Sequence, residues 1–188
     1  MPDVPVGNYI VMMLLTVTFA MQISFDSGQQ YLSSLILNRW SLAGITGHIW
    51  LHANVIHIVS NLIALFIFGR RVCLRLGNEN YPFAFFFAGI AAAAAHVAFD
   101  GRPAIGASGA VMGILGMYVV LCFGSFGRLG PWLILLWFLL NLTAGMTGYL
   151  PSAYMGHVGG FISGAALAGF LVFFKIVENC NTTIRTTA

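Results

Sequence analysis

The stretch AIGASGAVMGILG, residues 104–116, decides how the rest of the chain is organised. Its one hydroxyl side chain, Ser108, stands among small residues at the start of an apolar run. Gly109, Gly113 and Gly116 follow at a spacing that places them on one face of a helix. In a membrane, such a face lets a neighbouring helix approach very closely. The stretch therefore predicts a transmembrane helix that begins at Ser108 and packs tightly against another helix.

The composition requires a membrane protein. Hydrophobic residues make up 59% of the 188 residues and charged residues only 7%, more apolar surface than one soluble core of this size could hide. Strands of alternating apolar and polar residues are missing, which argues against a barrel. We therefore expect an all-α, polytopic membrane protein. No basic cluster is interleaved with aromatic residues, so nucleic acid is not an expected partner.

Six apolar runs are each long enough to cross a bilayer, which takes roughly 20 residues. They form a single membrane domain, residues 1–188, with spans at residues 9–25, 51–69, 81–99, 108–123, 132–149 and 155–176. A cleaved signal peptide is the rival interpretation of the first run. It is disfavoured because no basic residue precedes the run and no clear small-residue cleavage site follows it.

An even number of spans puts both termini on the same side of the membrane. Six of the 8 basic residues share that side, namely Arg70, Arg71, Arg75, Arg128, Lys175 and Arg185, and the other side has Arg39 and Arg102. Because positive residues concentrate in cytoplasmic loops, we expect cytoplasmic termini. The membrane is expected to be a bacterial cytoplasmic, or inner, membrane.

Three polar side chains from three spans are predicted to share one depth. His57 lies about 20 Å of helix before Arg70, which places it some 10 Å below the outer face of a bilayer core roughly 30 Å thick. Ser108 and His157 each lie at most about 9 Å inward from the start of their spans. The three side chains therefore meet near the outer face if their helices are neighbours.

A second glycine ridge lies beside His157. It consists of Gly156, Gly160, Gly164 and Ala168, which repeat every four residues. An ionisable group inside a span is costly and indicates function. If this ridge packs against the face that begins at Gly109, the imidazole reaches Ser108 and can act as its general base. The alternative is that Ser108 is only a small packing residue.

A serine nucleophile in this chain must operate as a dyad. The acids are Asp3, Asp26, Glu79, Asp100 and Glu178, and none lies inside a predicted span. Packing must then orient the imidazole, and Met112, one turn after Ser108, is expected to contact it through its sulfur. His57 and Asn61, one turn apart, are candidate oxyanion donors together with the Ser108 N–H. The alternative for this pair is a polar clamp between helices.

Two further histidines, His48 and His52, stand one turn apart before His57. They could suggest a metal site, but no carboxylate or cysteine converges on them and the HExxH pattern is absent. We expect no metal and no cofactor, and assign both histidines to shaping the loop before the second span. His96, near the outer end of the third span, is predicted to lie at the membrane interface.

The residues GASG at 106–109, a histidine followed by glycines at 157–160 and H-x-x-x-N at 57–61, on six spans in this order, resemble the rhomboid intramembrane serine proteases, in a minimal bacterial form. The resemblance implies a Ser108–His157 dyad with an oxyanion hole from the Ser108 N–H, His57 and Asn61. It implies hydrolysis of a peptide bond in or beside the helix of a single-span protein, near the outer membrane face. It also implies that residues 26–50 lie partly in the bilayer and that span five is the gate.

The supporting residues implied by the resemblance are His52, Gly106, Gly109, Met112 and Gly160. Two features depart from the family pattern. Ala43 and Gly44 stand where many bacterial members have a Trp-Arg pair, and Met112 replaces an aromatic residue that often stacks on the histidine. The competing hypotheses are an inactive rhomboid-like chaperone or adaptor, and a rhombosortase-like processor of C-terminal sorting tails. A small transporter is disfavoured because the two halves show no internal repeat.

Overall fold

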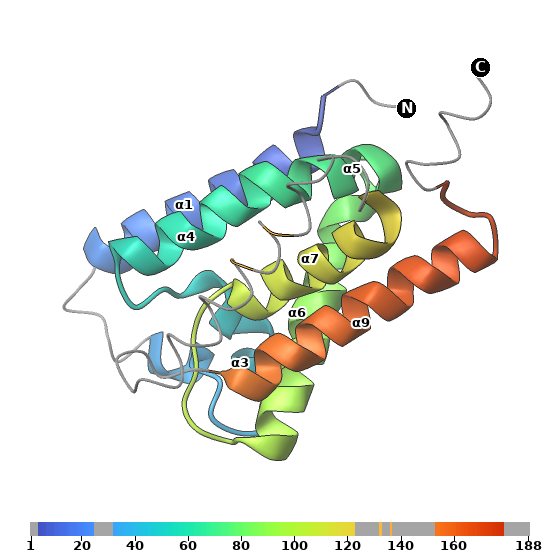
Figure 1. Cartoon of the computed structure of the whole chain (residues 1–188). Helices are drawn as coiled ribbons and strands as arrows, with labels where there is room; N and C mark the ends of the chain where they lie inside the picture. The colour runs from blue at the N-terminus through green and yellow to red at the C-terminus, as the bar shows by residue number, and fades with distance from the viewer. Residues whose placement is uncertain (1–3, 25–31, 123–131, 133–135, 137–152, 179–188) are drawn as a thin grey trace, which may run out of the picture.

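The computed structural model describes residues 4–24, 32–122, 132, 136 and 153–178, and its described part is built from helices (Figure 1). The main helices are α1 (Val6–Ser24), α4 (Val55–Ala64), α5 (Arg70–Leu76), α6 (Asn80–Phe99), α7 (Ser108–Cys122) and α9 (Tyr154–Phe173). Between α1 and α4 lie three short helices, η2 (Ser33–Leu35), α3 (Leu42–Gly47) and η3 (His48–Trp50). The all-α membrane fold predicted from the composition is confirmed.

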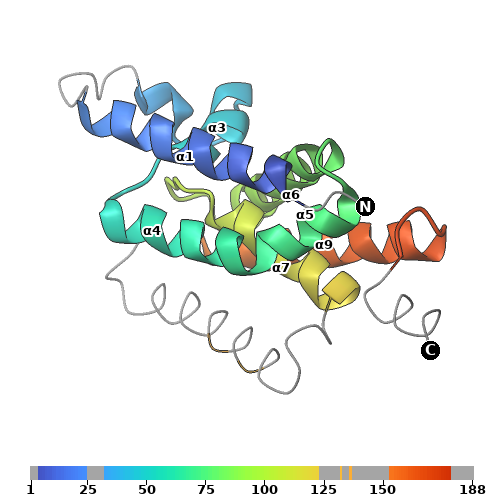
Figure 2. The ribbon, with the colours of Figure 1, turned by 90° about the horizontal axis from the view of Figure 1, so that it is seen from above.

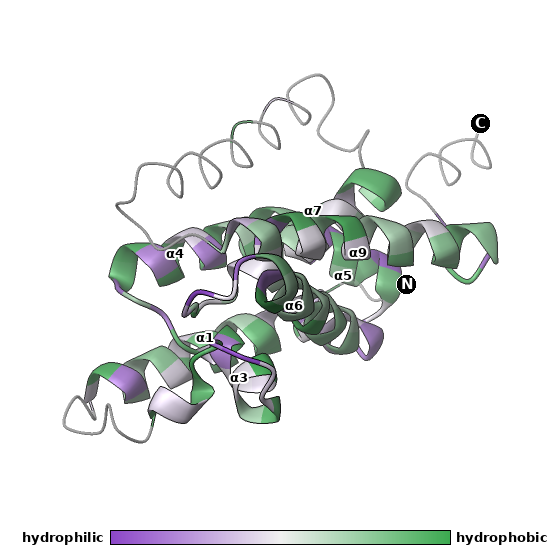
Figure 3. Cartoon of the chain, turned by 90° about the horizontal axis from the view of Figure 1, so that it is seen from below, coloured by the Kyte–Doolittle hydropathy of each residue, from purple (hydrophilic) through white to green (hydrophobic). Residues whose placement is uncertain are grey.

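Four helices are long and apolar enough to cross a membrane, so the protein is a multi-pass membrane protein. They are Val6–Ser24, Val55–Leu76, Asn80–Phe99 and Tyr154–Phe173. Large apolar side chains on their outer faces, such as Ile56 and Phe83, are exposed, and Figure 3 shows hydrophobic residues covering these helices. In water such a surface would be an aggregation hazard, whereas lipid solvates it. The span predicted at residues 132–149 lies outside the described residues, apart from Trp132 and Leu136.

The second membrane helix differs in its bounds from the predicted residues 51–69. It begins at Val55, because the side chain of Asn54 caps it by accepting the N–H of His57 at 2.8 Å. It then passes through a π-helical turn, η4 (Leu65–Gly69), and continues as α5 to Leu76. Arg70 and Arg71 therefore lie within the helix rather than beyond its end.

Helix α7 is the central element of the fold. Its 15 residues make about 22 Å of helix, shorter than the bilayer core, and nearly all of them are buried. Figures 1 and 2 show α7 running between α4 and α9, with α1 on the far side of α4. Because α7 is surrounded by helices rather than by lipid, its ends are placed by protein contacts. This gives Ser108, its first residue, a defined position.

The two predicted glycine faces meet between α7 and α9. A Cβ added to Gly160 would collide with the carbonyl oxygen of Gly109, and one added to Gly164 would collide with that of Gly113. A Cβ on Gly113 would collide with Ala88 of α6 as well. Small residues are thus required at this crossing because backbone packs directly on backbone. The predicted packing of the two faces is confirmed.

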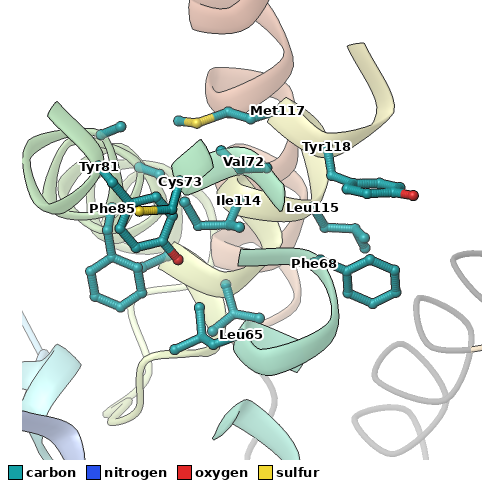
Figure 4. Close-up of a cluster of buried hydrophobic side chains, with 14 of the residues drawn as sticks. Leu65, Phe68, Val72, Cys73, Tyr81, Phe85, Ile114, Leu115, Met117 and Tyr118 are labelled. Carbon is teal, nitrogen blue, oxygen red and sulfur yellow. The ribbon is translucent and has the colours of Figure 1, made fainter. Parts of the chain in front are cut away.

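Residues of α4, η4, α5, α6 and α7 form a dense apolar core (Figure 4). Phe68 and Tyr118 pack edge to face, with ring centroids 5.2 Å apart. Around them lie Leu65, Val72, Ile114 and Leu115, all buried. In lipid, helix association depends on such close packing, since lipid tails are as apolar as the side chains. The core holds α4, α5 and α7 together, away from Ser108 and His157 at the beginnings of α7 and α9.

Candidate active site

Ser108 and His157 meet at the beginnings of their helices. The Ser108 side-chain oxygen, Oγ, lies 2.8 Å from Nε2 of His157, and both residues are largely buried. Ser108 is the first residue of α7, and His157 lies in the first turn of α9, where its N–H donates to Ala153 (Figure 1). The glycine contact one turn deeper sets the helix separation that allows this hydrogen bond. A hydroxyl hydrogen-bonded to an imidazole can transfer its proton to that imidazole.

The second imidazole nitrogen of His157, Nδ1, has no hydrogen-bond partner among the described residues. In the Ser-His-Asp arrangement, an aspartate holds that nitrogen. Within the described part of the chain, the Ser108–His157 pair therefore has no third, carboxylate partner. The ring is held by its Nε2 contact with Ser108 and by packing. Met112 is fully buried in the core beneath, and its sulfur contact with the imidazole stays a prediction.

His57 lies against the loop that leads to Ser108. A Cβ on Gly106 would lie 2.6 Å from Cε1 and 2.7 Å from Nε2 of the His57 ring. Gly106 also has φ +123°, a conformation that favours glycine. The ring nitrogen on the other side, Nδ1, accepts the N–H of Ala53 at 3.5 Å. This contact favours the tautomer of neutral His57 that carries its proton on Nε2, the nitrogen nearest Gly106, from which it can be donated.

Asn61 follows His57 by one turn of α4 and is buried, with 1% of its surface exposed. Its amide nitrogen has no hydrogen-bond partner in the described part of the chain. A buried donor without a partner is expensive and is uncommon in native proteins. Asn61 and the first N–H groups of α7, which have no acceptor inside the helix, are therefore donors available to an incoming oxygen atom.

The residues before Ser108 are anchored by the segment between α1 and α4. Leu37 and Ala104 form a β-bridge through two backbone hydrogen bonds of 3.0 and 2.7 Å. The N–H of Gly106 donates to the carbonyl of His48 at 2.8 Å. Through these contacts, residues 32–52 support residues 100–107, the loop between α6 and α7 that leads to Ser108 and is called the serine loop below. The Leu37 bridge has no periodic signal in the sequence.

His52 contacts both the serine loop and His57. Its Nε2 accepts the N–H of Ala107 at 3.5 Å, and its ring centroid lies 5.1 Å from that of His57. Burial lowers the pKa of His52 to about 4, with a smaller contribution from the charge on His57. The ring is therefore neutral near pH 7, as an acceptor must be. Phe19 of α1 packs against its other side.

The interfacial placement predicted for His96 is wrong. Only 1% of its surface is exposed, and its Nε2 is 2.7 Å from the carbonyl oxygen of Arg102. The imidazole bonds a carbonyl of the turn after α6 and does not face lipid headgroups. Asp100 in this turn binds Arg102 through two hydrogen bonds of 2.6 and 3.0 Å, which lower the pKa of its carboxyl group. The sequence did offer a sign of this local role, because His96 lies in the last turn of α6, four residues before Asp100.

His48 stays outside the dyad. Its Nδ1 is 3.0 Å from the carbonyl oxygen of Gly44, and burial lowers its pKa to about 4. Gly44 needs to be small because a Cβ there would press on the backbone of Ile36. Within the described ranges, no three histidine, cysteine or acidic side chains are grouped to hold a metal ion. The candidate site thus combines the Ser108–His157 hydrogen bond with His52 and His57 against the loop before Ser108 and with the buried amide of Asn61 on α4.

The comparisons with known proteins agree in naming one family. The model of the rhomboid domain matches residues 39–174. Rhomboid-type serine protease 2 of Emericella nidulans is 31% identical over 123 residues, 63% of this chain and 24% of that protein. RHOMBOID-like protein 1 of Arabidopsis thaliana is 25% identical over 148 residues, 76% of this chain and 37% of that protein. RHOMBOID-like protein 6, mitochondrial, from the same plant, is 27% identical over 143 residues, 73% of this chain and 45% of that protein.

This chain therefore spans between about a quarter and a half of the length of these relatives. The match to the domain model is of a different kind, because it extends over most of this chain, from the short helices before α4 to the end of α9. The matched residues include the serine loop, Ser108, and the three histidines His52, His57 and His157. The chain belongs to the rhomboid family.

Proposed function

We propose that the protein is an intramembrane serine endopeptidase in which Ser108 is the nucleophile and His157 the general base. The observation that supports this most strongly is the 2.8 Å hydrogen bond between the Ser108 hydroxyl and His157 Nε2. It joins two helices whose sequence positions are 49 residues apart, within a membrane bundle. A buried, hydrogen-bonded Ser-His pair beside unpartnered amide donors is the arrangement that acyl transfer requires.

The proposed reaction proceeds in two halves. Ser108 Oγ attacks the carbonyl carbon of a peptide bond while its proton passes to His157 Nε2. The tetrahedral oxyanion accepts hydrogen bonds from the Ser108 N–H, His57 and Asn61. It collapses as His157 gives the proton to the leaving amine, which breaks the C–N bond. Water then attacks the serine ester with His157 as base, which releases the acid and restores Ser108.

The proposed substrates are single-span membrane proteins. The site lies at the start of α7 and α9, and large apolar side chains on α4 face outward toward lipid. A substrate helix must unwind there, because its peptide bonds are otherwise hidden within its own hydrogen bonds. We expect small residues at the cleaved bond. We also propose that both termini face the cytoplasm of a bacterial inner membrane, as the basic residues indicate.

The test is covalent labelling of the detergent-purified protein with a fluorophosphonate probe, followed by cleavage of a single-span reporter. We expect the parent to label and cleave, and Ser108→Ala and His157→Ala to do neither. Ser163→Ala is the matched control, because its hydroxyl lies in α9 and bonds only back to its own helix at Gly160 in the described structure. A folded parent that neither labels nor cleaves would refute the proposal and favour an inactive, adaptor-like role.

A further inference from the structure

Gln22, near the end of α1, forms a two-point contact with the backbone of a residue 30 positions away. Its Nε2 donates to the carbonyl oxygen of His52 at 2.8 Å, and its Oε1 accepts the N–H of His52 at 3.0 Å. The amide thus matches both backbone groups of one residue. Thr18, one turn earlier on α1, donates to the carbonyl of Trp50 at 3.4 Å in the same segment. Helix α1 therefore contacts the stretch before α4 through polar groups as well as apolar packing.

The peptide unit that Gln22 binds continues directly to His57. The carbonyl of His52 accepts from Gln22, and the other end of the same peptide bond, the N–H of Ala53, donates to Nδ1 of His57. Hydrogen bonds in such a chain polarise one another. The link also favours one tautomer of His57, because an accepting Nδ1 leaves the proton on Nε2. Nε2 is the nitrogen beside Gly106.

The same residue also reaches the serine loop. The His52 ring accepts the N–H of Ala107, the residue before Ser108, and lies edge-on to His57. A shift of the His52 backbone would therefore move the partner of His57 and the partner of Ala107 together. His57 is a proposed oxyanion donor, and Ala107 precedes Ser108, whose N–H is another.

We propose that Gln22 is a positioning residue: through the His52–Ala53 peptide it holds His57 in the Nε2–H tautomer and aims that proton at the oxyanion. This inference rests on the proposed function. Gln22 acts on His57 through the backbone and is assigned no contact with the substrate. The alternative is a structural tie that fastens α1 to the bundle, with no specific link to His57.

The first test compares turnover in Gln22→Met and Gln22→Glu. Methionine keeps the length but loses both hydrogen bonds, and we expect kcat per active site to fall about tenfold or more, less than the roughly 10²- to 10³-fold cost of deleting an oxyanion donor. KM should stay within about twofold, since the proposal gives Gln22 no contact with the substrate. Active sites are counted by fluorophosphonate titration. Ser24→Ala, whose hydroxyl bonds Ala20 in its own helix, is the control.

Gln22→Glu adds a pH readout that a structural tie would not change in the same way. An ionised carboxylate can accept the His52 N–H but repels the His52 carbonyl, whereas a protonated carboxyl can donate to it. We expect the ratio of the variant's kcat to the parent's to rise as the pH falls toward about 4, near the ordinary carboxyl pKa. A ratio that stays constant with pH would contradict the proposal.

The decisive test is a double-mutant cycle with His57→Ala. If Gln22 acts through His57, Gln22→Met should lower kcat by less than about twofold in that background. Multiplying losses, or a Gln22→Met variant with the parent's kcat, would overturn the inference. Either result leaves the proposed function intact when the parent cleaves and Ser108→Ala does not. A parent that behaves like Ser108→Ala would instead refute the proposed function, and this inference with it.

Discussion

Two buried polar clusters lie in different parts of this bundle and treat their hydrogen bonds in opposite ways. In the first, the fully buried Asn8 of α1 donates to the carbonyl of Leu65 at 3.1 Å and accepts the hydroxyl of Tyr81 at 2.6 Å. In the second, at the start of α7 and α9, the Ser108–His157 bond is surrounded by nitrogen atoms that have no described partner.

We interpret the difference as a division of roles: the Asn8 cluster stabilises the bundle, and the Ser108 cluster serves the proposed reaction. A satisfied polar network within a membrane ties helices together, and Asn8 joins α1, the π-helical turn and α6 in this way. Gly69 is required beside it, because a Cβ there would press on both Asn8 and Tyr81. A buried, unsatisfied donor such as Asn61 lowers stability, so its presence is explained where a bound ligand would accept its hydrogen bond. We therefore expect the two clusters to respond to mutation in opposite ways.

The largest effect is expected from removing the dyad. Ser108→Ala and His157→Ala should each lower kcat about 10⁴- to 10⁶-fold. The reason is that the serine needs the imidazole to take its proton, and the imidazole has no nucleophile to activate without the serine. Their unfolding free energies should stay within about 1 kcal/mol of the parent's, since neither residue is part of the core. Cleavage rates and unfolding by SDS, measured on the same preparations, check both halves. Loss of stability together with activity would erase the contrast between the clusters.

The next largest effect is expected at the oxyanion donors. Asn61→Ala and His57→Ala should each lower kcat about 10²- to 10³-fold with little change in KM, as expected for groups that bind the transition state. The measurement is steady-state cleavage of a single-span reporter. Ser60→Ala on the same helix, whose hydroxyl bonds the carbonyl of His57, is the control. A rise in KM at constant kcat would assign both residues to substrate binding instead.

The opposite response is expected at the Asn8 cluster. Tyr81→Phe removes the hydroxyl that donates to the side-chain oxygen of Asn8, Oδ1, at 2.6 Å. The loss should lower the unfolding free energy by about 1–2 kcal/mol. Turnover per active site should remain that of the parent. Thr16→Val, an exposed α1 position whose hydroxyl bonds its own helix, should change neither quantity. A Tyr81→Phe variant with normal stability and reduced kcat would reverse the assignment of this cluster.

The last contrast between the clusters is a dependence of stability on pH, expected at the site end. Burial lowers the pKa of both His48 and His52 from 6.5 to about 4 in the folded protein. The unfolded chain then binds more protons between about pH 6.5 and pH 4. Stability is therefore complete above that window and falls by about 1 kcal/mol per pH unit for each histidine as the pH drops through it.

Unfolding titrations from pH 7.5 to 4.5 measure this dependence, and His52→Gln should reduce its slope. Asn8 has an amide that does not titrate, so Asn8→Leu should lower the whole curve without changing its slope. A parent whose stability is flat across this range would show that the two histidines are not held neutral by burial.

Much of the arrangement was predictable, because a membrane limits what the chain can do. The glycine spacing in α7 and α9 predicted their contact, and the helical positions of Ser108 and His157 beside these glycines predicted that the two side chains meet. Helix bounds were less accurate. The second span starts later than predicted, at Val55, since the cap at Asn54 depends on a local hydrogen bond rather than on hydropathy.

By itself, then, the sequence determined the helical membrane fold, the helix pair with backbone contact and the side chains that gather at one end. Each of these follows from apolar length or from the helical repeat, which are local properties of the chain. Only the tertiary structure decided that Nδ1 of His57 faces the Ala53 N–H, that Leu37 supports the serine loop and that Gln22 reaches His52. These contacts join irregular segments far apart in the chain, and their geometry depends on loop conformations that no periodic pattern encodes.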